Sequence, residues 1–192
     1  MNRRDAIARV GLLVGGTVIG AEAFLSGCGK RSETAATALG FSSDVILLLD
    51  EVGETILPTT SSSPGAKAAG IGEFMKTIVT DCYEKKDQQI FISGIDLFKK
   101  SVQQKHGKSF ITLTGEEKKQ LILLLDTEAK EYGKNKKEED PAHYFSMIKQ
   151  LTLWGYFTSE VGAQKALRYL PVPGKYEGCI EYTKGDRAWA EI

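Results

Sequence analysis

Residues 43–57 read Ser-Asp-Val-Ile-Leu-Leu-Leu-Asp-Glu-Val-Gly-Glu-Thr-Ile-Leu, and Pro58 follows. This stretch decides the fold class, because its apolar residues recur every three or four positions and so share one face of an α-helix. Ser42 or Ser43 can cap the helix start, and Pro58 stops the helix. The expected core positions of this helix are Val45, Leu48, Leu49, Val52 and Ile56.

Three further segments repeat the helical spacing. The first opens at Pro64 and the second near Asp87, and Gly107 is a typical C-terminal stop for the second. The third follows a capping box, in which the Thr114 oxygen and the Glu117 carboxylate each satisfy a backbone donor. The expected core positions of the three are Ile71, Phe74 or Met75, Ile78 and Cys82; Phe91, Ile95, Phe98 and Val102; and Leu121, Leu124, Leu125 and Tyr132.

The remaining apolar positions predict a fifth helix and a short sixth one. Pro141 suits the first turn of the fifth helix, and the sixth starts from Ser159. Residues 171–192 are rich in proline and glycine with little periodicity, which is typical of an extended tail. The expected core positions of the two helices are Tyr144, Met147 or Ile148, Leu151 and Trp154, then Val161, Ala166 or Leu167 and Leu170.

These patterns together predict an all-α fold. No run of alternating apolar and polar residues is long enough to predict a sheet. We therefore expect a single helical domain over residues 42–192, a compact bundle of five or six helices with an extended C-terminal tail.

The charge balance and the motifs exclude several classes of function. The chain has 25 basic and 25 acidic residues, so no basic field attracts nucleic acid. It has no glycine-rich phosphate loop and no cysteine or histidine spacing typical of a metal site. We expect no catalytic, cofactor-binding or metal-binding residue in this chain. The expected surface side chains are His106 and His143, and the expected solvated or lysine-paired helix face is formed by Asp50, Glu51 and Glu54.

The first 28 residues resemble a bacterial export signal. Arg3 and Arg4 precede a glycine-rich apolar stretch, as in twin-arginine signals, which carry folded cargo. The sequence Leu-Ser-Gly-Cys ending at Cys28 resembles a lipoprotein processing box, in which the cysteine is acylated. We expect residues 1–27 to be an export signal peptide and residues 28–41 to be the lipidated cysteine and a flexible tether. The domain would then lie on the periplasmic side of the cell envelope, anchored to the membrane by lipid.

Three alternatives to this interpretation stay open. The residues around the arginine pair depart from the usual twin-arginine pattern, which leaves the general secretory route. Ala21-Glu22-Ala23 fits an ordinary signal-peptidase site, and cleavage there would leave Cys28 without lipid. The third alternative is an uncleaved membrane anchor, although the apolar region over 10–25 is shorter than the about 20 residues that a spanning helix needs.

Two cysteines remain once Cys28 is assigned to lipid. Cys82 and Cys179 could form a disulfide in an oxidising periplasm, with a stabilisation of about 2–5 kcal/mol. The alternative is two separate buried thiols, because Cys82 falls on an apolar helix face.

Two stretches resemble the small subunit of membrane-bound gluconate 2-dehydrogenase, called subunit 3 or gamma. The first is the helix end at Ile56-Leu57-Pro58, a short loop, and Pro64-Gly65-Ala66 at the start of the next helix. The second reads Gly155-Tyr156-Phe157-Thr158-Ser159-Glu160 and closes with Val172-Pro173-Gly174. The resemblance extends roughly from Asp44 to Cys179.

The resemblance implies a non-catalytic accessory subunit of an oxidoreductase complex. Such subunits pair with a large flavin-dependent sugar or polyol dehydrogenase of the glucose–methanol–choline type, often alongside a cytochrome c subunit. FAD would lie in the large subunit, which must cross the membrane folded because FAD is inserted in the cytoplasm. One twin-arginine signal could then carry both chains.

Two other functions stay open beside this one. The first is an envelope lipoprotein module that recruits another partner. The second is an enzyme that contributes a residue such as Glu160 or His143 to a shared active site.

Aromatic residues in and after the second stretch are the candidate partner contacts, because aromatics are favoured at interface centres. Trp154 falls on the core stripe of its helix. The expected contacts are therefore Tyr156, Phe157, Tyr169 and Tyr176, with core packing as the alternative role.

Overall fold

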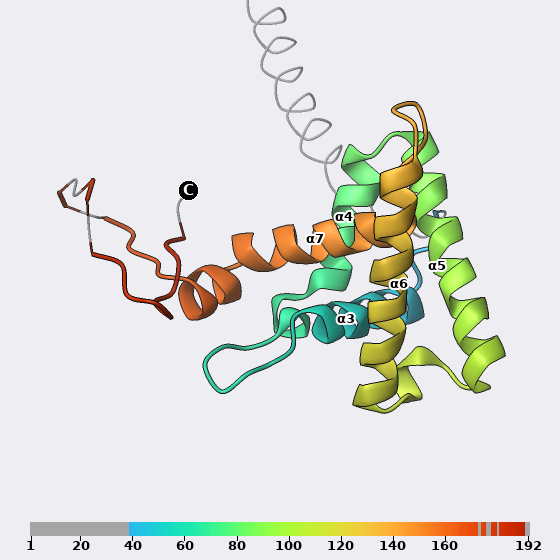
Figure 1. The fold of residues 1–192 in the computed structure, drawn as a ribbon, viewed down its shortest axis with the longest axis horizontal. Helices are drawn as coiled ribbons and strands as arrows, with labels where there is room; N and C mark the ends of the chain where they lie inside the picture. The colour runs from blue at the N-terminus through green and yellow to red at the C-terminus, as the bar shows by residue number, and fades with distance from the viewer. Residues whose placement is uncertain (1–38, 173, 176–177, 180, 191–192) are drawn as a thin grey trace, which may run out of the picture.

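The computed structural model describes residues 39–172, 174–175, 178–179 and 181–190. Over these ranges the chain forms five α-helices with three short helical turns and no β-strand (Figure 1). The predicted all-α fold is confirmed. The helices are α3 (Ser43–Ile56), α4 (Ile71–Cys82), α5 (Lys85–His106), α6 (Gly115–Asn135) and α7 (Tyr144–Thr158), and the turns are η1 (Ala66–Ala69), η2 (Phe110–Thr112) and η3 (Gly162–Ala166).

The helix boundaries follow from the capping residues. The Ser42 hydroxyl accepts a hydrogen bond from the Val45 N–H at the start of α3. Both bonds of the capping box are present at the start of α6, where the Thr114 N–H donates to the Glu117 carboxylate at 2.8 Å. Gly107 ends α5 with φ of +64°, a left-handed conformation that favours glycine. These three predictions are confirmed.

The start of α7 differs from its prediction. Pro141 does not lie in the first turn, because the helix begins three residues later, at Tyr144. Its N-cap is His143, whose ring nitrogen Nδ1 accepts a hydrogen bond from the Phe145 N–H at 3.2 Å. A side chain that caps the helix thus sets the boundary in place of the proline.

Helix α3 is the central element, and it packs against α4, α6 and α7. Helix α5 packs against α4 and α7, and η2 joins it to α3. The core combines apolar side chains from all five helices. Its most deeply buried large side chains are Leu49, Ile71, Met75, Val79, Phe91, Val102, Phe145 and Leu151.

Five expected core positions are exposed in the structure, among them Cys82 at the end of α4. Helix α6 buries the face that carries Leu121, Ile122, Leu125 and Ala129, so Leu124 is 53% exposed. Tyr132 and Leu170 are also exposed, and Trp154 is half exposed. On α6 the buried face lies one residue away from the expected stripe, because neighbouring helices and not the number of leucines decide which face is covered.

Glycines let α7 approach its neighbours closely. A Cβ at Gly94 would fall on the ring of Tyr144, where α5 crosses α7. A Cβ at Gly155 would lie 2.5 Å from Cδ1 of Phe74, where α4 crosses α7. The first half of α7 is therefore held inside the bundle, and its second half projects beyond α5 and α6 towards η3 and the C-terminal segment (Figure 1).

The C-terminal segment is extended over its described residues, as expected. Its one regular contact is an isolated bridge between Arg168 and Trp189. The Arg168 guanidinium also lies 5.1 Å from the centre of the Trp189 ring and 3.2 Å from Asp186. Arg187 donates a hydrogen bond at 3.1 Å to the carbonyl of Ser62, which ties the segment to the loop after α3.

Candidate functional site

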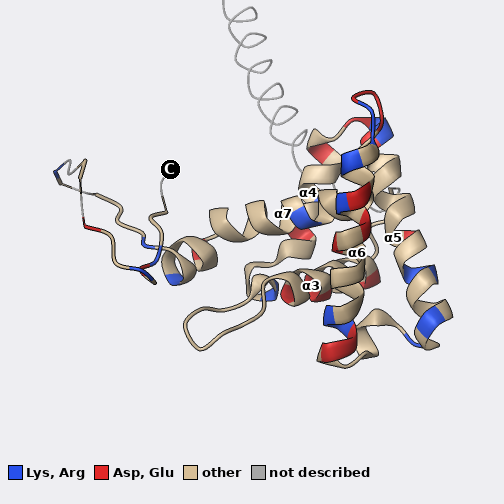
Figure 2. Ribbon diagram, viewed as in Figure 1, with Lys and Arg blue, Asp and Glu red and all other residues tan. Residues whose placement is uncertain are grey.

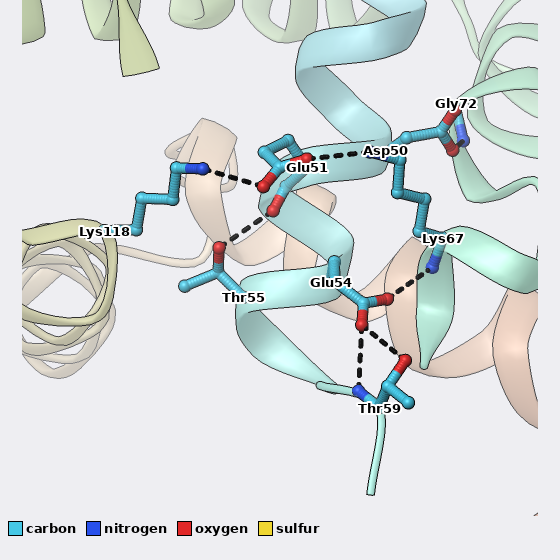
Figure 3. Close-up of polar contacts among 8 residues, drawn as sticks. All are labelled: Asp50, Glu51, Glu54, Thr55, Thr59, Lys67, Gly72 and Lys118. Atoms are coloured by element: carbon cyan, nitrogen blue, oxygen red, sulfur yellow. Dashed lines mark hydrogen bonds and ion pairs between the residues drawn. The ribbon is translucent and has the colours of Figure 1, made fainter. Parts of the chain in front are cut away.

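Two carboxylates on the polar face of α3 bind backbone groups of the segments that follow it. Oδ1 of Asp50 accepts a hydrogen bond from the Gly72 N–H at 2.7 Å (Figure 3). Glu54 accepts three, from the N–H and hydroxyl of Thr59 at 2.8 and 2.7 Å and from the Lys67 N–H at 3.0 Å. These bonds fix the loop after α3, the turn η1 and the start of α4.

Glu51 on the same face joins three elements by ion pairs. One oxygen lies 2.8 Å from Nζ of Lys118 on α6, and the other lies 3.0 Å from Nζ of Lys67 on η1 (Figure 3). Burial alone would raise the pKa of Glu51, but the hydrogen bonds from Lys118 and Lys67 hold this pKa below its ordinary value. The Lys118 ammonium also lies 5.8 Å from the centre of the Phe110 ring.

The carboxylates of α3 therefore have structural roles. The sequence predicted a solvated or lysine-paired face, and the lysine pairing is confirmed for Glu51. Asp50 and Glu54 bind backbone N–H groups instead, a role that the sequence did not reveal. Both oxygens of Glu51 and both of Glu54 are occupied by these partners.

A cavity of about 600 Å³ lies beside this face, between α3, α6 and the start of α7. Its apolar walls include Ile56, Ile122 and Phe145. Asp126 and Lys149 of a second ion-pair cluster also line it. In this cluster Asp126 lies 2.7 Å from Lys130 and 2.5 Å from Lys149. Hydrogen bonds from these two lysines keep the pKa of Asp126 below its ordinary value.

The described residues contain no group of three or more His, Cys, Asp or Glu side chains placed to hold a metal ion. His143 is not the surface side chain that the sequence predicted, because only 12% of it is exposed and it caps α7. Burial lowers the pKa of His143, although the nearby Glu128 carboxylate opposes this effect. At neutral pH the ring is therefore uncharged and its Nδ1 is free to accept the Phe145 N–H.

An exposed apolar surface covers the projecting half of α7. Leu153, Trp154 and Phe157 are 37, 51 and 39% exposed, and we call these three residues the α7 aromatic surface. Residues 151–159 carry no charged side chain, and Figure 2 shows this part of the helix without Lys, Arg, Asp or Glu. Exposed Tyr169, Leu170 and Val172 follow η3 at the same end of the molecule.

Two side chains beneath this surface hold its rings in place. The Phe74 ring meets the Trp154 ring edge-on, with 5.5 Å between centres. The Tyr156 ring meets the Phe157 ring in the same way at 5.2 Å. Tyr156 is itself fixed, because its hydroxyl donates a hydrogen bond at 2.5 Å to the carbonyl of Pro64.

The structure places the predicted contact residues in different environments. Tyr156 is 3% exposed and belongs to the core, so its side chain is not available to a partner. Phe157 and Tyr169 are 39 and 41% exposed. Tyr176 lies outside the described residues, as do Arg3, Arg4 and Cys28.

The sequence predicted that Trp154 lies in the core and Tyr156 at the surface. The structure shows the opposite arrangement. The buried stripe of α7 continues from Leu151 to Gly155 and Tyr156, so Trp154 falls beside the stripe and not on it. Gly155 was the available signal, since a glycine at a core position marks close approach of a second helix.

The two other cysteines are free and exposed in the structure. The alternative in which Cys82 and Cys179 are separate buried thiols is therefore wrong about burial, because both residues are exposed. Cys82 is the last residue of α4, where the helix ends at the surface. Their pairing in an oxidising compartment stays a prediction.

The second half of α7 and the loop held by Glu54 contain sequence stretches that resemble a known family. Residues 44–174 match the family described as gluconate 2-dehydrogenase subunit 3. This chain belongs to that family. The subunit 3 match spans all five described α-helices except the first residue of α3, so the family domain is the helical bundle itself. No curated protein and no solved structure matches the chain.

Membership implies that the chain is the small subunit of a dehydrogenase complex and that it associates with the other subunits of that complex. In this subunit 3 domain, no described helix is both long enough and apolar enough to cross a membrane.

Proposed function

We propose that this chain is the non-catalytic accessory subunit of a flavin-dependent dehydrogenase of the glucose–methanol–choline type, which acts on a sugar or polyol. It stabilises the large subunit and escorts it through twin-arginine export. Membership of the gluconate 2-dehydrogenase subunit 3 family over residues 44–174 is the observation that carries this proposal.

The distribution of polar and apolar side chains supports an accessory role. The carboxylates of Glu51 and Glu54 are engaged in contacts that stabilise the fold. The α7 aromatic surface, in contrast, is exposed and has no partner of its own over much of its area. A chain whose carboxylates stabilise its own fold and whose exposed surface is apolar is suited to binding another protein.

The escort role rests on residues 1–28 and on the chemistry of flavoproteins. A large subunit that receives FAD in the cytoplasm must be exported folded. Arg3 and Arg4 would direct the pair to the twin-arginine translocase, and acylation of Cys28 would keep the complex at the periplasmic face of the membrane. A cytochrome c subunit is a further partner in this proposal.

Export of the complex tests the proposal. The full chain with Arg3→Lys and Arg4→Lys is expressed in its source cells, and the cytoplasmic, periplasmic and membrane fractions are assayed for this chain and for flavin-dependent dye reduction. We expect both this chain and the flavin-dependent dye reduction to remain in the cytoplasm. Dehydrogenase activity in the periplasmic or membrane fraction at the wild-type level would contradict the escort role.

A second measurement separates the proposed complex from a lipoprotein module with an unrelated partner. Tagged wild-type chain is purified from detergent-solubilised membranes, and the eluate is examined for bound flavin by absorbance and fluorescence. We expect a flavoprotein larger than this chain in the eluate. Recovery of partners without flavin would favour the lipoprotein module.

A further inference from the structure

Two exposed aromatic rings on the projecting half of α7 are held in fixed positions by neighbouring rings. Trp154 is 51% exposed, yet its ring is fixed by the edge-on contact with Phe74. Phe157 is fixed by Tyr156 in the same way. Exposed aromatic side chains that are already held in one position lose little conformational freedom on binding, which is a property of strong contact residues.

The backbone beneath these rings is also fixed. Gly155 lies against Phe74 so closely that a Cβ would be only 2.5 Å from that ring. The Tyr156 hydroxyl is bonded to the Pro64 carbonyl, which itself belongs to the loop held by Glu54. The position of the α7 aromatic surface is therefore set by α4 and by the loop after α3.

The charge of this surface indicates the chemistry of its partner. Residues 151–159 are uncharged in a chain of which 26% of residues are charged. Depletion of charge together with enrichment in aromatic residues is the composition of an interface centre. The complementary surface is therefore uncharged and apolar.

Two cavities in the described part of the chain carry charged side chains, so neither offers an uncharged hollow to the α7 aromatic surface of a second copy. The half of α7 that carries the α7 aromatic surface projects from the bundle, which suits insertion into a hollow of its partner (Figure 1). The cavity between α3 and α6 is lined by Glu51, Lys118 and Asp126, and a second cavity of about 500 Å³ is lined by Asp44, Lys99 and Lys100. Both hollows carry charges that an uncharged aromatic surface does not match.

We propose that Trp154, with Leu153 and Phe157, is the anchor that inserts into an uncharged apolar hollow of the large dehydrogenase subunit. Phe74 and Gly155 are positioning residues that hold the anchor. This inference rests on the proposed function and specifies its contact residues. Tyr169, Leu170 and Val172 extend the contact at the same end of the molecule.

The test uses the full chain co-expressed with the flavoprotein that co-purifies with it. Trp154→Ala is compared with Leu97→Ala, because Leu97 on α5 is a similarly exposed apolar side chain, at 61%, that does not belong to the α7 aromatic surface. Binding is measured as the dissociation constant of the purified pair. We expect Trp154→Ala to weaken binding at least about tenfold and Leu97→Ala to leave it unchanged.

Further variants distinguish contact from loss of folding. The thermal midpoint of each variant is measured alone, and Trp154→Phe, which keeps a ring against Phe74, is expected to restore part of the affinity. Wild-type affinity in Trp154→Ala would overturn the anchor while leaving the proposed function intact. Absence of any flavoprotein with the wild-type chain would overturn both. Dissociation of a wild-type homodimer by Trp154→Ala would assign the surface to a second copy and overturn the inference.

Discussion

Asp50 on α3 caps the first turn of α4, because its Oδ1 accepts the N–H of Gly72 at 2.7 Å across 22 residues of sequence. Helix α4 has no side-chain cap of its own, since its N-cap residue is Gly70. The negative carboxylate lies at the positive end of the helix dipole. The two helices also approach closely there, and a Cβ at Gly72 would lie 2.5 Å from the Ile46 carbonyl oxygen.

Replacement of Asp50 tests this cap. Asp50→Ala leaves the Gly72 N–H without its acceptor, and we expect the free energy of unfolding to fall by about 1–2 kcal/mol. Asp50→Asn keeps an acceptor of the same shape and should lose less. Urea unfolding followed by circular dichroism measures both, and equal losses in the two variants would show that the charge alone matters.

Substitution of two helical glycines by alanine should have opposite effects. Gly94→Ala places a methyl group against the Tyr144 ring at the crossing of α5 and α7, and we expect a loss of about 1–3 kcal/mol. Gly133→Ala on α6 meets nothing within 4 Å, and we expect a gain of about 0.5–1 kcal/mol from helix propensity. Thermal unfolding of the two variants gives the comparison, and a stabilising Gly94→Ala would contradict the close crossing.

Acid should remove the stabilisation that Glu51 provides. Its pKa is below the ordinary value of 4.5 because Lys118 and Lys67 bind the charged form. The contribution is thus complete above pH 4.5 and is lost as the pH falls through the lowered pKa. We expect Glu51→Gln to reduce the unfolding free energy by about 1 kcal/mol at pH 6 and by progressively less below pH 4.5. A difference that is constant down to pH 3 would contradict the ion pairs.

A separate dependence on pH should arise from His143 at milder acidity. Burial lowers its pKa below 6.5, so protonation favours the unfolded chain. Its contribution is complete above pH 6.5 and declines as the pH falls below that value. Protonated Nδ1 also cannot accept the Phe145 N–H.

His143→Asn keeps a capping acceptor that does not titrate. We expect the wild-type chain to lose stability relative to this variant between pH 7.5 and pH 5.5, measured by urea unfolding at each pH. Parallel pH profiles of the two proteins in that range would contradict the neutral cap.

Local pattern was sufficient for the elements whose causes are local. The three-to-four spacing of apolar residues in α3, the Ser42 cap and the Thr114–Glu117 capping box all depend on residues within a few positions of one another. The same reasoning predicted the wrong buried face of α6 at Leu124. A periodic pattern shows that a face is apolar, but the neighbouring helices decide which of two overlapping faces is covered.

The features of the candidate site also fall into those that the sequence predicts and those that depend on the tertiary structure. The sequence by itself determined that the chain is an all-α bundle, that its charges balance, and that aromatic residues gather at the end of one helix. Only the tertiary structure decided that Asp50 and Glu54 bind backbone groups distant in sequence, and that Trp154 is exposed while Tyr156 is buried. The physical reason is that burial and partner choice depend on where α4 crosses α7 at Gly155. Phe74 and Gly155 meet there although they are 81 residues apart in the chain, and local periodicity does not specify which helices cross.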